Sequence, residues 1–393
     1  MNSKLKRSKI VLVIDPRGII INGGADAINR HIKYGEELNR IDKEFTLIVL
    51  STSNLEFKPI NKGSLAEIHK ISGPTLNSYK FARLAAKFLA EKKWDIELLV
   101  AGDPWESYWS AFLLRRIMQF KIPIQIQLHA DIADPKWKRL NFITRARFNL
   151  AGLSLSRAEA IRVVSKSQLA NLKKSFRING QKVTIIPIPI KTLDLVLKVQ
   201  QKKPLSIGFI GRLHQDRGIW EFVELVNKLN SQNKTFKIVI AGSGPDKDEF
   251  LNQLYIEVPK SRVSYLGQLP QEKLARLWKQ IGVLVSIAPV ESYGRVMREA
   301  LVAGVPVWAT ESSGVKDLMD KCEKGTVKIL DLNKSASVLN QDFEILLKTK
   351  VGLKFGKEFI KENNTYAAKL AQSWVKVINQ SRQSELYLVE SSS

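Results

Sequence analysis

Two arginines stand in a short glycine-flanked segment whose composition suits phosphate binding. The segment is GRLHQDRG, residues 211–218, in which Arg212 and Arg217 lie between Gly211 and Gly218. A guanidinium donates two parallel hydrogen bonds to phosphate oxygens, and glycine lets the backbone come close to a ligand. The segment therefore indicates a diphosphate site. A surface loop with solvated arginines has the same appearance and stays an open alternative.

Two glutamates in the segment VESYGRVMREALVAGVPV, residues 290–307, form the second candidate group. We expect a helix to begin at Gly294, so that Glu291 lies in the preceding loop and Glu299 in the second turn. Helix N-termini bind anions, whereas carboxylates accept hydrogen bonds from sugar hydroxyls. The alternative is a pair of solvated acids near the positive end of the helix dipole. The small and apolar neighbouring residues favour a polyol ligand.

Both groups directly follow short apolar runs, which we interpret as buried strands separated by helices. The first half has such runs at 9–15, 45–51, 96–102, 123–130, 161–165 and 183–188, and the second half has them at 205–211, 236–242, 262–267, 283–289 and 305–310. This pattern predicts an α/β protein with two doubly wound, Rossmann-like domains facing each other across a cleft. Ligands of such sheets bind beyond the carboxyl ends of the strands, where both candidate groups stand.

The length of 393 residues exceeds what one hydrophobic core usually supports. We expect a first domain over 1–190, a linker over 191–204 and a second domain over 205–372. A C-terminal helix over about 373–393 is expected to cross back to the first domain. The proline-containing stretch with a basic end at 187–204 is a plausible hinge.

The formal net charge of +24 is the one unusual feature of the composition. It suggests an anionic partner, and more than half of the excess lies in residues 1–200. Residues 136–177 hold a single acid, Glu159, among eleven basic residues: Lys136, Lys138, Arg139, Arg145, Arg147, Arg157, Arg162, Lys166, Lys173, Lys174 and Arg177. The interleaved apolar residues suit an anionic membrane surface. A scaffold helix with solvated charges is the alternative.

Cysteine content and targeting signals exclude several classes of protein. The single cysteine, Cys322, excludes a disulfide framework and a thiolate metal cluster. The first apolar run, IVLVI, is too short for a signal peptide, and no stretch reaches the roughly 18 apolar residues of a membrane span. We therefore expect a cytoplasmic protein, with peripheral binding to the inner face of the cytoplasmic membrane as a further hypothesis.

Taken together, the motifs resemble the nucleotide-binding domain of the retaining family 4 glycosyltransferases, which have the GT-B fold. The resemblance covers about residues 205–318 through the ordered segments GFIGRLHQDRG, IVIAGSGP, VSYLGQLPQEKL and PVESYGRVMREALVAGVPVWATESSGVKDLM. Glu291 and Glu299 match the E-x7-E element of that family. The first half is similar more loosely, through GGADAINRHIKYGEEL, LHAD and IRVVSKSQ.

The resemblance implies a role for each residue at a matching position. In the second half, Arg212 and Arg217 would bind the donor diphosphate, Glu299 the ribose, and Glu291 with Ser292, Tyr293 and Gly294 the donor sugar, while Leu269 would lie beside the base. In the first half, Gly23 and Gly24 would let the backbone approach the diphosphate, and His129 and Asp131 would lie at the reacting sugar. His129, Asp131 and Glu291 are the candidate catalytic residues, although a structural role for His129 stays open and Glu291 is not assigned as a nucleophile.

This chain departs from the family pattern at two positions. Arg217 stands where the family usually has lysine, which keeps the charge but changes the geometry. Arg295 stands where the family usually has an apolar residue. That change bears on which sugar or acceptor is accepted.

The implied reaction moves a sugar from a nucleotide-diphosphate sugar to an acceptor hydroxyl with retention of the anomeric configuration. Two fixed arginines can stabilise the leaving diphosphate, so we expect neither a metal nor a cofactor. The expected acceptor is a glycan or a lipid-linked molecule in cell-envelope polysaccharide or glycolipid assembly. A non-catalytic GT-B-like scaffold and a basic nucleic-acid-binding α/β protein are the alternatives. No recognised nucleic-acid module supports the latter, so we expect no nucleic-acid partner.

Overall fold

The computed structural model describes residues 9–92, 94–139, 141–190, 204–232, 235–270 and 273–390. The chain divides into two compact units. Unit 1 comprises the residues up to Pro187 together with those from Thr365 onward, and unit 2 comprises Ile188–Asn364. Each unit contains a predominantly parallel sheet with helices, so the expected Rossmann-like architecture of both halves is confirmed.

Unit 1 is built on a sheet with the strand order β3-β4-β2-β1-β5-β6-β7-β8. The strands are β1 (Lys9–Asp15), β2 (Phe45–Thr52), β3 (Ile60–Asn61), β4 (Ala66–Ser72), β5 (Asp95–Ala101), β6 (Ile124–Gln127), β7 (Ala160–Val163) and β8 (Val183–Ile185). All neighbours pair in parallel except β3, which runs antiparallel to β4. Side chains of β1 alternate between two apolar clusters, so both faces of this sheet are covered.

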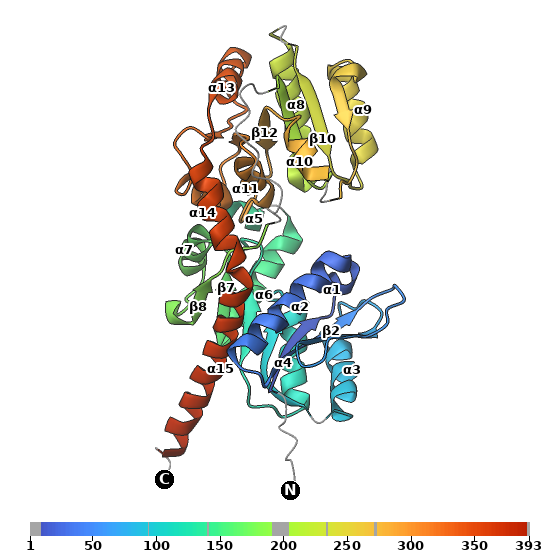
Figure 1. Cartoon of the computed structure of the whole chain (residues 1–393), viewed down its shortest axis with the longest axis vertical. Coiled ribbons are helices and arrows are strands. Elements are labelled where there is room, and N and C mark those ends of the chain that lie inside the picture. Colours follow the sequence, from blue (N-terminus) through green and yellow to red (C-terminus); the bar gives the residue numbers. More distant parts are fainter. Residues whose placement is uncertain are drawn as a thin grey trace. The chain divides into compact units, whose positions relative to one another are not determined.

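The helices of unit 1 cover these faces. They are α1 (Ile19–Asn22), α2 (Gly24–Ile41), α3 (Ser78–Ala90), α4 (Glu106–Ile117), α5 (Pro135–Arg139), α6 (Phe142–Arg157), α7 (Lys166–Ser175) and α15 (Tyr366–Glu390). Figure 1 shows α15 beside α2, although the two helices are more than 300 residues apart in the sequence. Tyr366 and Trp374 of α15 belong to the same apolar cluster as Tyr34 of α2.

Unit 2 is built on a fully parallel sheet with the order β11-β10-β9-β12-β13-β14. Its strands are β9 (Ser206–Ile210), β10 (Lys237–Ala241), β11 (Val263–Tyr265), β12 (Val283–Ser286), β13 (Val307–Ala309) and β14 (Val327–Ile329). Its helices are α8 (Ile219–Asn230), α9 (Lys247–Glu257), α10 (Leu274–Trp278), α11 (Arg295–Val302), α12 (Ser313–Met319), α13 (Ala336–Lys348) and α14 (Leu353–Asn364). Figure 1 shows α8 and α9 beside β10.

Some features differ from the sequence-based expectations. Strands β3, β4 and β14 were not expected. The sequence of β4, AEIHKIS, mixes polar and apolar residues, which suits a strand near the sheet edge that is buried on one side. The expected linker 191–204 lies outside the described residues except for Pro204. The crossing helix, expected over about 373–393, spans Tyr366–Glu390 and so includes the whole run YAAKLAQSWVKVI (366–378), which resembles the crossing helix of the family; its first turns pack in the core of unit 1. Among the described residues, no helix combines the length and apolar character needed to cross a bilayer.

Candidate active site

The two candidate phosphate-binding arginines lie in the loop between β9 and α8 of unit 2. Arg212 is exposed and has no acidic partner in the described part of the chain. Arg217 ends a short 3₁₀ turn, Gln215–Arg217 (η2), and its side chain is 44% exposed. Gly218 follows with φ +74°, and a Cβ there would lie 2.5 Å from the carbonyl oxygen of Ile287. Only glycine fits this junction, so the sequence fixes the course of the arginine loop.

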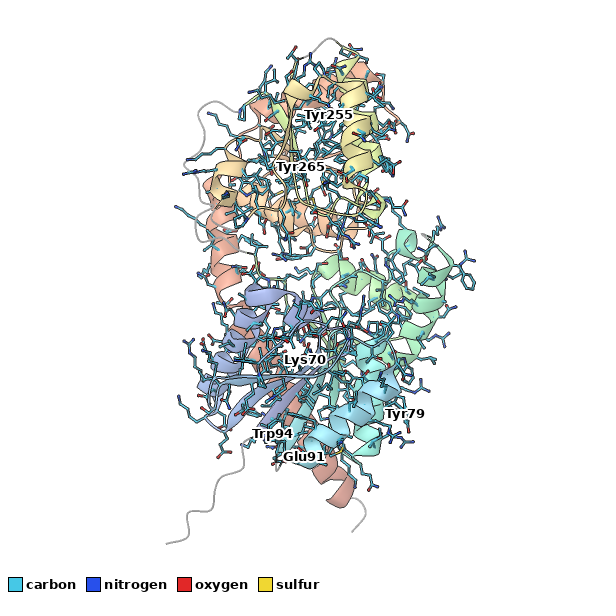
Figure 2. All side chains as sticks on the ribbon, turned by 90° about the vertical axis from the view of Figure 1, so that its right-hand side faces the viewer. Lys70, Tyr79, Glu91, Trp94, Tyr255 and Tyr265 are labelled. Carbon is cyan, nitrogen blue, oxygen red and sulfur yellow. The ribbon has the colours of Figure 1, made fainter. Side chains whose placement is uncertain are left out.

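The segment GSGP after β10 packs against the backbone of the arginine loop. A Cβ on Gly242 would lie 1.8 Å from the carbonyl oxygen of Gly211, and one on Gly244 would lie 1.9 Å from that of Leu213. The hydroxyl of Tyr265, which Figure 2 labels in unit 2, donates to the Gly242 carbonyl oxygen at 3.1 Å. The glycines of GSGP therefore serve backbone-to-backbone packing beneath the arginine loop. Leu269 is half-buried in the loop that follows β11.

Glu291 joins the arginine loop to the start of helix α11. Its Oε1 accepts hydrogen bonds from the backbone N–H groups of Gly294 at 2.9 Å and Tyr293 at 3.3 Å. Its Oε2 accepts one from Arg217 Nη1 at 3.3 Å. The side chain is 23% exposed, so the carboxylate remains accessible at the surface of the unit. Four of the predicted site residues, Arg217, Glu291, Tyr293 and Gly294, are thus connected by hydrogen bonds.

Glu299 lies on the buried side of α11 but keeps about a tenth of its side chain exposed. Gly294 begins the helix with φ +70°, a left-handed conformation that favours glycine. Arg295, the second departure from the family pattern, places its Nη2 at 3.9 Å from Oε1 of Glu299, one turn away on the same helix. This arginine therefore lies next to the carboxylate that the resemblance assigns to the ribose.

The structure adds a residue that sequence reasoning missed, the fully buried Arg298 of α11. Its guanidinium carbon lies 3.8 Å from the ring centroid of Tyr293, and its Nη2 donates to Oδ2 of Asp317 at 2.7 Å. Asp317 is 3% exposed, so this is a buried ion pair. Within the described residues, Nε and Nη1 of Arg298 have no hydrogen-bond acceptor. Arg298 therefore contacts the loop of Glu291 through the ring of Tyr293.

Gly314, at the start of α12, is the second missed residue of this loop. Its N–H donates to the carbonyl oxygen of Glu291 at 2.7 Å. A Cβ on Gly314 would lie 2.6 Å from that oxygen and 2.8 Å from the nitrogen of Tyr293. The TESSG sequence contained this signal, since a glycine at a helix start after a strand indicates a close approach of backbone. Nothing in the sequence pairs Arg298 with Asp317.

The predicted site residues of unit 1 surround the ends of β1 and β6. His129 follows β6. The residue as a whole is exposed, but the contact between its Nδ1 and Nη1 of the fully buried Arg162, at 3.3 Å, is partly buried, so the desolvation acts on this side of the ring. Because a guanidinium only donates, Nδ1 must accept and the ring proton sits on Nε2. Desolvation of the ring and, second, the charge of Arg162 lower the pKa of His129 to about 3. The imidazole is therefore neutral and offers an N–H donor.

Arg162 itself is fixed by the chain that leaves unit 1. Its Nε donates to the carbonyl oxygen of Ile186 at 2.8 Å and its Nη2 to that of Pro187 at 2.6 Å. Its guanidinium carbon lies 5.6 Å from the ring centroid of Tyr366. The buried Arg162 therefore contacts three parts of unit 1: the candidate catalytic His129, the end of the first segment at Ile186 and Pro187, and the start of helix α15 at Tyr366.

Asp131 is fully buried and accepts a hydrogen bond from Asn171 of α7 at 2.8 Å. Its carboxylate is directed into unit 1, so it holds the loop that follows His129. Gly23 and Gly24 are exposed at the junction of α1 and α2. Gly24 has φ +66°, whereas Gly23 has φ −73° and is restricted by space, because a Cβ there would lie 2.7 Å from the carbonyl oxygen of Ile19.

Comparison with solved structures assigns the fold. An Escherichia coli structure, trehalose-6-phosphate bound with UDP-2-fluoro glucose, matches 95% of this chain and 99% of its own, with a TM-score of 0.67 and 12% sequence identity. At this identity the likeness shows the fold alone. The chain has the GT-B fold, with two Rossmann-like units.

Sequence comparisons agree with the resemblance seen in the motifs. Residues 197–362 match the family model "Glycosyl transferases group 1", so the resemblance is confirmed at this level. An uncharacterized glycosyltransferase of Methanocaldococcus jannaschii is 23% identical over 72% of this chain and 76% of its own length. The phosphatidylinositol N-acetylglucosaminyltransferase GPI3 subunit of Saccharomyces cerevisiae is 21% identical over an aligned part that covers 43% of this chain and 39% of that protein.

Proposed function

We propose that the chain transfers a sugar from a nucleotide-diphosphate sugar to an acceptor hydroxyl, with retention of the anomeric configuration. The observation that carries this proposal is the connected group in unit 2, in which Glu291 bridges Arg217 and the N–H groups at the start of α11. An exposed guanidinium beside a partly exposed carboxylate matches a ligand that contains both phosphate and sugar. The family match of unit 2 and the UDP-2-fluoro glucose bound by the Escherichia coli structure support the same donor class.

In the proposed reaction, Arg212 and Arg217 stabilise the negative charge that develops on the leaving diphosphate. Arg217 uses one N–H for Glu291, and a guanidinium has five N–H donors, so it can bind phosphate without giving up this contact. The leaving phosphate oxygen takes the proton of the acceptor hydroxyl as the new glycosidic bond forms on the same face. Two fixed cations supply the charge stabilisation, so the reaction is proposed to need no metal ion.

The residues of unit 1 have two different proposed tasks. His129 donates from Nε2–H to an oxygen of the donor sugar, because its ring is neutral and its Nδ1 already faces Arg162. Asp131, buried and bonded to Asn171, acts through the loop it holds and is a positioning residue. Gly23 and Gly24 let backbone approach the diphosphate, and Leu269 of unit 2 lies beside the base.

The acceptor is proposed to be a glycan or a lipid-linked molecule of the cell envelope. The protein would then work on the inner face of the cytoplasmic membrane as a peripheral protein. The proposal is supported by the charge excess of unit 1 and by the names of glycolipid-synthesising relatives, among them the GPI3 subunit and a sulfoquinovosyl transferase of Arabidopsis thaliana.

Calorimetry with UDP-, GDP- and ADP-sugars tests the donor site. Replacement of Arg212 by alanine removes a charge-assisted contact and should weaken donor binding about ten- to hundredfold. Arg276→Ala is the matched control, because Arg276 is an exposed arginine of unit 2 on α10. Equal donor affinity of Arg212→Ala and Arg276→Ala would contradict the diphosphate assignment. Absence of any donor binding would favour the non-catalytic scaffold.

The stereochemistry and the metal requirement need separate measurements. NMR of the product formed from an α-linked donor should show an α-linkage, and a β-linkage would overturn the retaining assignment. Turnover should be unchanged after treatment with EDTA. Loss of turnover that Mg²⁺ restores would show that the two arginines do not suffice.

A further inference from the structure

Helix α6 (Phe142–Arg157) of unit 1 is apolar on both of its sides. Its inner side packs in the unit, where Ala151, Ser154 and Leu155 are buried. Its outer side carries four large apolar residues that remain exposed: Phe142 81%, Ile143 66%, Leu150 39% and Leu153 48%. A helix that only covers a soluble core has polar residues on its outer side. The outer side of α6 therefore points to a function outside the core of unit 1.

These exposed apolar residues are concentrated on α6. No other helix or strand in the described part of the chain has more than two large apolar side chains in this exposed class. Phe142, Leu150 and Leu153 lie on one side of the helix, since at about 100° per residue they fall within roughly 80° of one another around its axis. Several exposed apolar side chains on one side of a helix indicate an interaction site, whereas single exposed residues do not.

Hydrogen bonds to neighbouring residues of unit 1 fix the position of α6. The indole N–H of Trp105 donates to the carbonyl oxygen of Arg147 at 2.8 Å, and the hydroxyl of Ser154 donates to that of Pro104 at 2.5 Å. Asn141 and Thr144 form a capping box at the N-terminus, directly beside Phe142. The exposed position of the apolar side chains is therefore part of the folded structure.

The charged residues of α5 and α6 themselves have one sign. The sequence has no acidic residue from Pro135 to Ala158. Five basic residues of α5 and α6 are exposed: Lys136, Lys138, Arg139, Arg145 and Arg157. Arg147 is the exception among the arginines, because its Nη2 is paired with Oε1 of Glu106 at 2.7 Å. An apolar strip bordered by cations complements a surface that is apolar inside and anionic outside.

We propose that the outer side of α6 docks on an anionic lipid bilayer, with Phe142 and Ile143 inserted between the headgroups and the neighbouring cations bound to lipid phosphates. A second copy of the chain fits less well, because two such basic surfaces would repel each other. The inference names the surface by which the enzyme would reach a lipid-linked acceptor, and in that respect it rests on the proposed function. Membrane binding itself requires no donor or acceptor.

Sedimentation of the full chain with vesicles tests this surface. The chain should bind vesicles of phosphatidylglycerol and phosphatidylcholine in equal parts, and it should not bind vesicles of phosphatidylcholine alone. The double variant Phe142→Ser/Ile143→Ser should bind at least tenfold more weakly, since two apolar side chains no longer insert. Replacement of Lys138, Arg139 and Arg145 by glutamine should weaken binding about fivefold per charge and remove most of its salt dependence.

Matched variants keep the result specific. Ile256→Ser removes an apolar side chain that is 74% exposed on α9 of unit 2, and Lys58→Gln/Lys62→Gln removes exposed charges elsewhere in unit 1. Both controls should bind vesicles like the unchanged chain, and circular dichroism should show that all variants fold. Equal vesicle binding of the Phe142→Ser/Ile143→Ser variant and the Ile256→Ser control would overturn the proposal. A dimer dispersed by the α6 variant without vesicle binding would also overturn it, in favour of a second copy.

Donor binding separates this inference from the proposed function. Calorimetry of the Phe142→Ser/Ile143→Ser variant should give the donor affinity of the unchanged chain. Vesicle binding without any donor binding would sustain the membrane surface and contradict the glycosyl transfer. Donor binding without vesicle binding would contradict the proposed membrane surface and leave the proposed glycosyl transfer standing.

Discussion

Replacement of Arg298 by methionine should both destabilise unit 2 and weaken donor binding. Arg298 is fully buried, pairs with Asp317 at 2.7 Å and lies against the ring of Tyr293 at 3.8 Å. Methionine has a similar length and no charge, so it removes the ion pair with little change in packed volume. Tyr293 belongs to the loop in which Glu291 contacts Arg217. Loss of the contact between Arg298 and Tyr293 should therefore also displace residues of the donor site.

The size of the effect can be estimated from the contacts. Removal of one partner of a buried ion pair costs about 3–5 kcal/mol, because the other charge stays buried. A desolvated cation–π contact adds about 2 kcal/mol. Two effects oppose these losses: Lys321 lies 3.5 Å from Asp317 and keeps part of the pairing, and the two unpartnered N–H groups of Arg298 disappear. We therefore expect a loss of about 3 kcal/mol in the free energy of unfolding.

Denaturant unfolding and calorimetry with the donor measure the two consequences. The double variant Arg298→Met/Asp317→Leu removes both charges and should recover most of the stability, since an apolar pair of similar volume replaces a buried ion pair at little cost. Donor affinity should stay reduced in the double variant, because Tyr293 still lacks its cation. Arg276→Met is the control. Equal stability of Arg298→Met and Arg276→Met, or an unchanged donor affinity, would refute the reasoning.

Three more substitutions test neighbouring parts of the two sites. Arg162→Met should raise the pKa of His129, measured by NMR titration, but not to its ordinary value because desolvation is the larger cause; an unchanged pKa would contradict the contact. Arg295→Leu restores the family pattern and should change donor affinity through Glu299, 3.9 Å away, and calorimetry with a panel of donors would detect it. Gly314→Ala should weaken donor binding at least tenfold, because a Cβ 2.6 Å from a carbonyl oxygen displaces the loop; normal affinity would show that the loop tolerates the shift.

Acid should destabilise unit 1 through the same histidine. The folded-state pKa of His129 is about 3, below the ordinary value of 6.5, so the unfolded chain binds a proton in this interval that the folded chain does not. Stability should therefore fall as the pH decreases from about 6.5 toward 3. His129→Gln should reduce this slope in denaturant unfolding measured across the interval, and an identical slope would contradict the lowered pKa.

Most strands, and the glycine loops that carry the candidate groups, could be predicted from the sequence. An apolar run such as 9–15 can be buried on both faces only in a covered parallel sheet, and the structure has a strand there. Gly218 and Gly294 were readable because glycine marks the positions where backbone turns into a helix. These signals are local, since they depend on residues adjacent in the chain.

Tertiary structure alone decided which distant residues support these groups. The pairing of Arg298 with Asp317 and the contact of Arg162 with His129 join residues 19 and 33 positions apart, and no periodicity connects them. The sequence predicted a membrane surface within 136–177, but only the structure shows that Phe142, Ile143, Leu150 and Leu153 are the exposed apolar residues of α6. Burial of a charge and exposure of an apolar side chain are properties of the packed molecule, so they appear only when the elements are placed together.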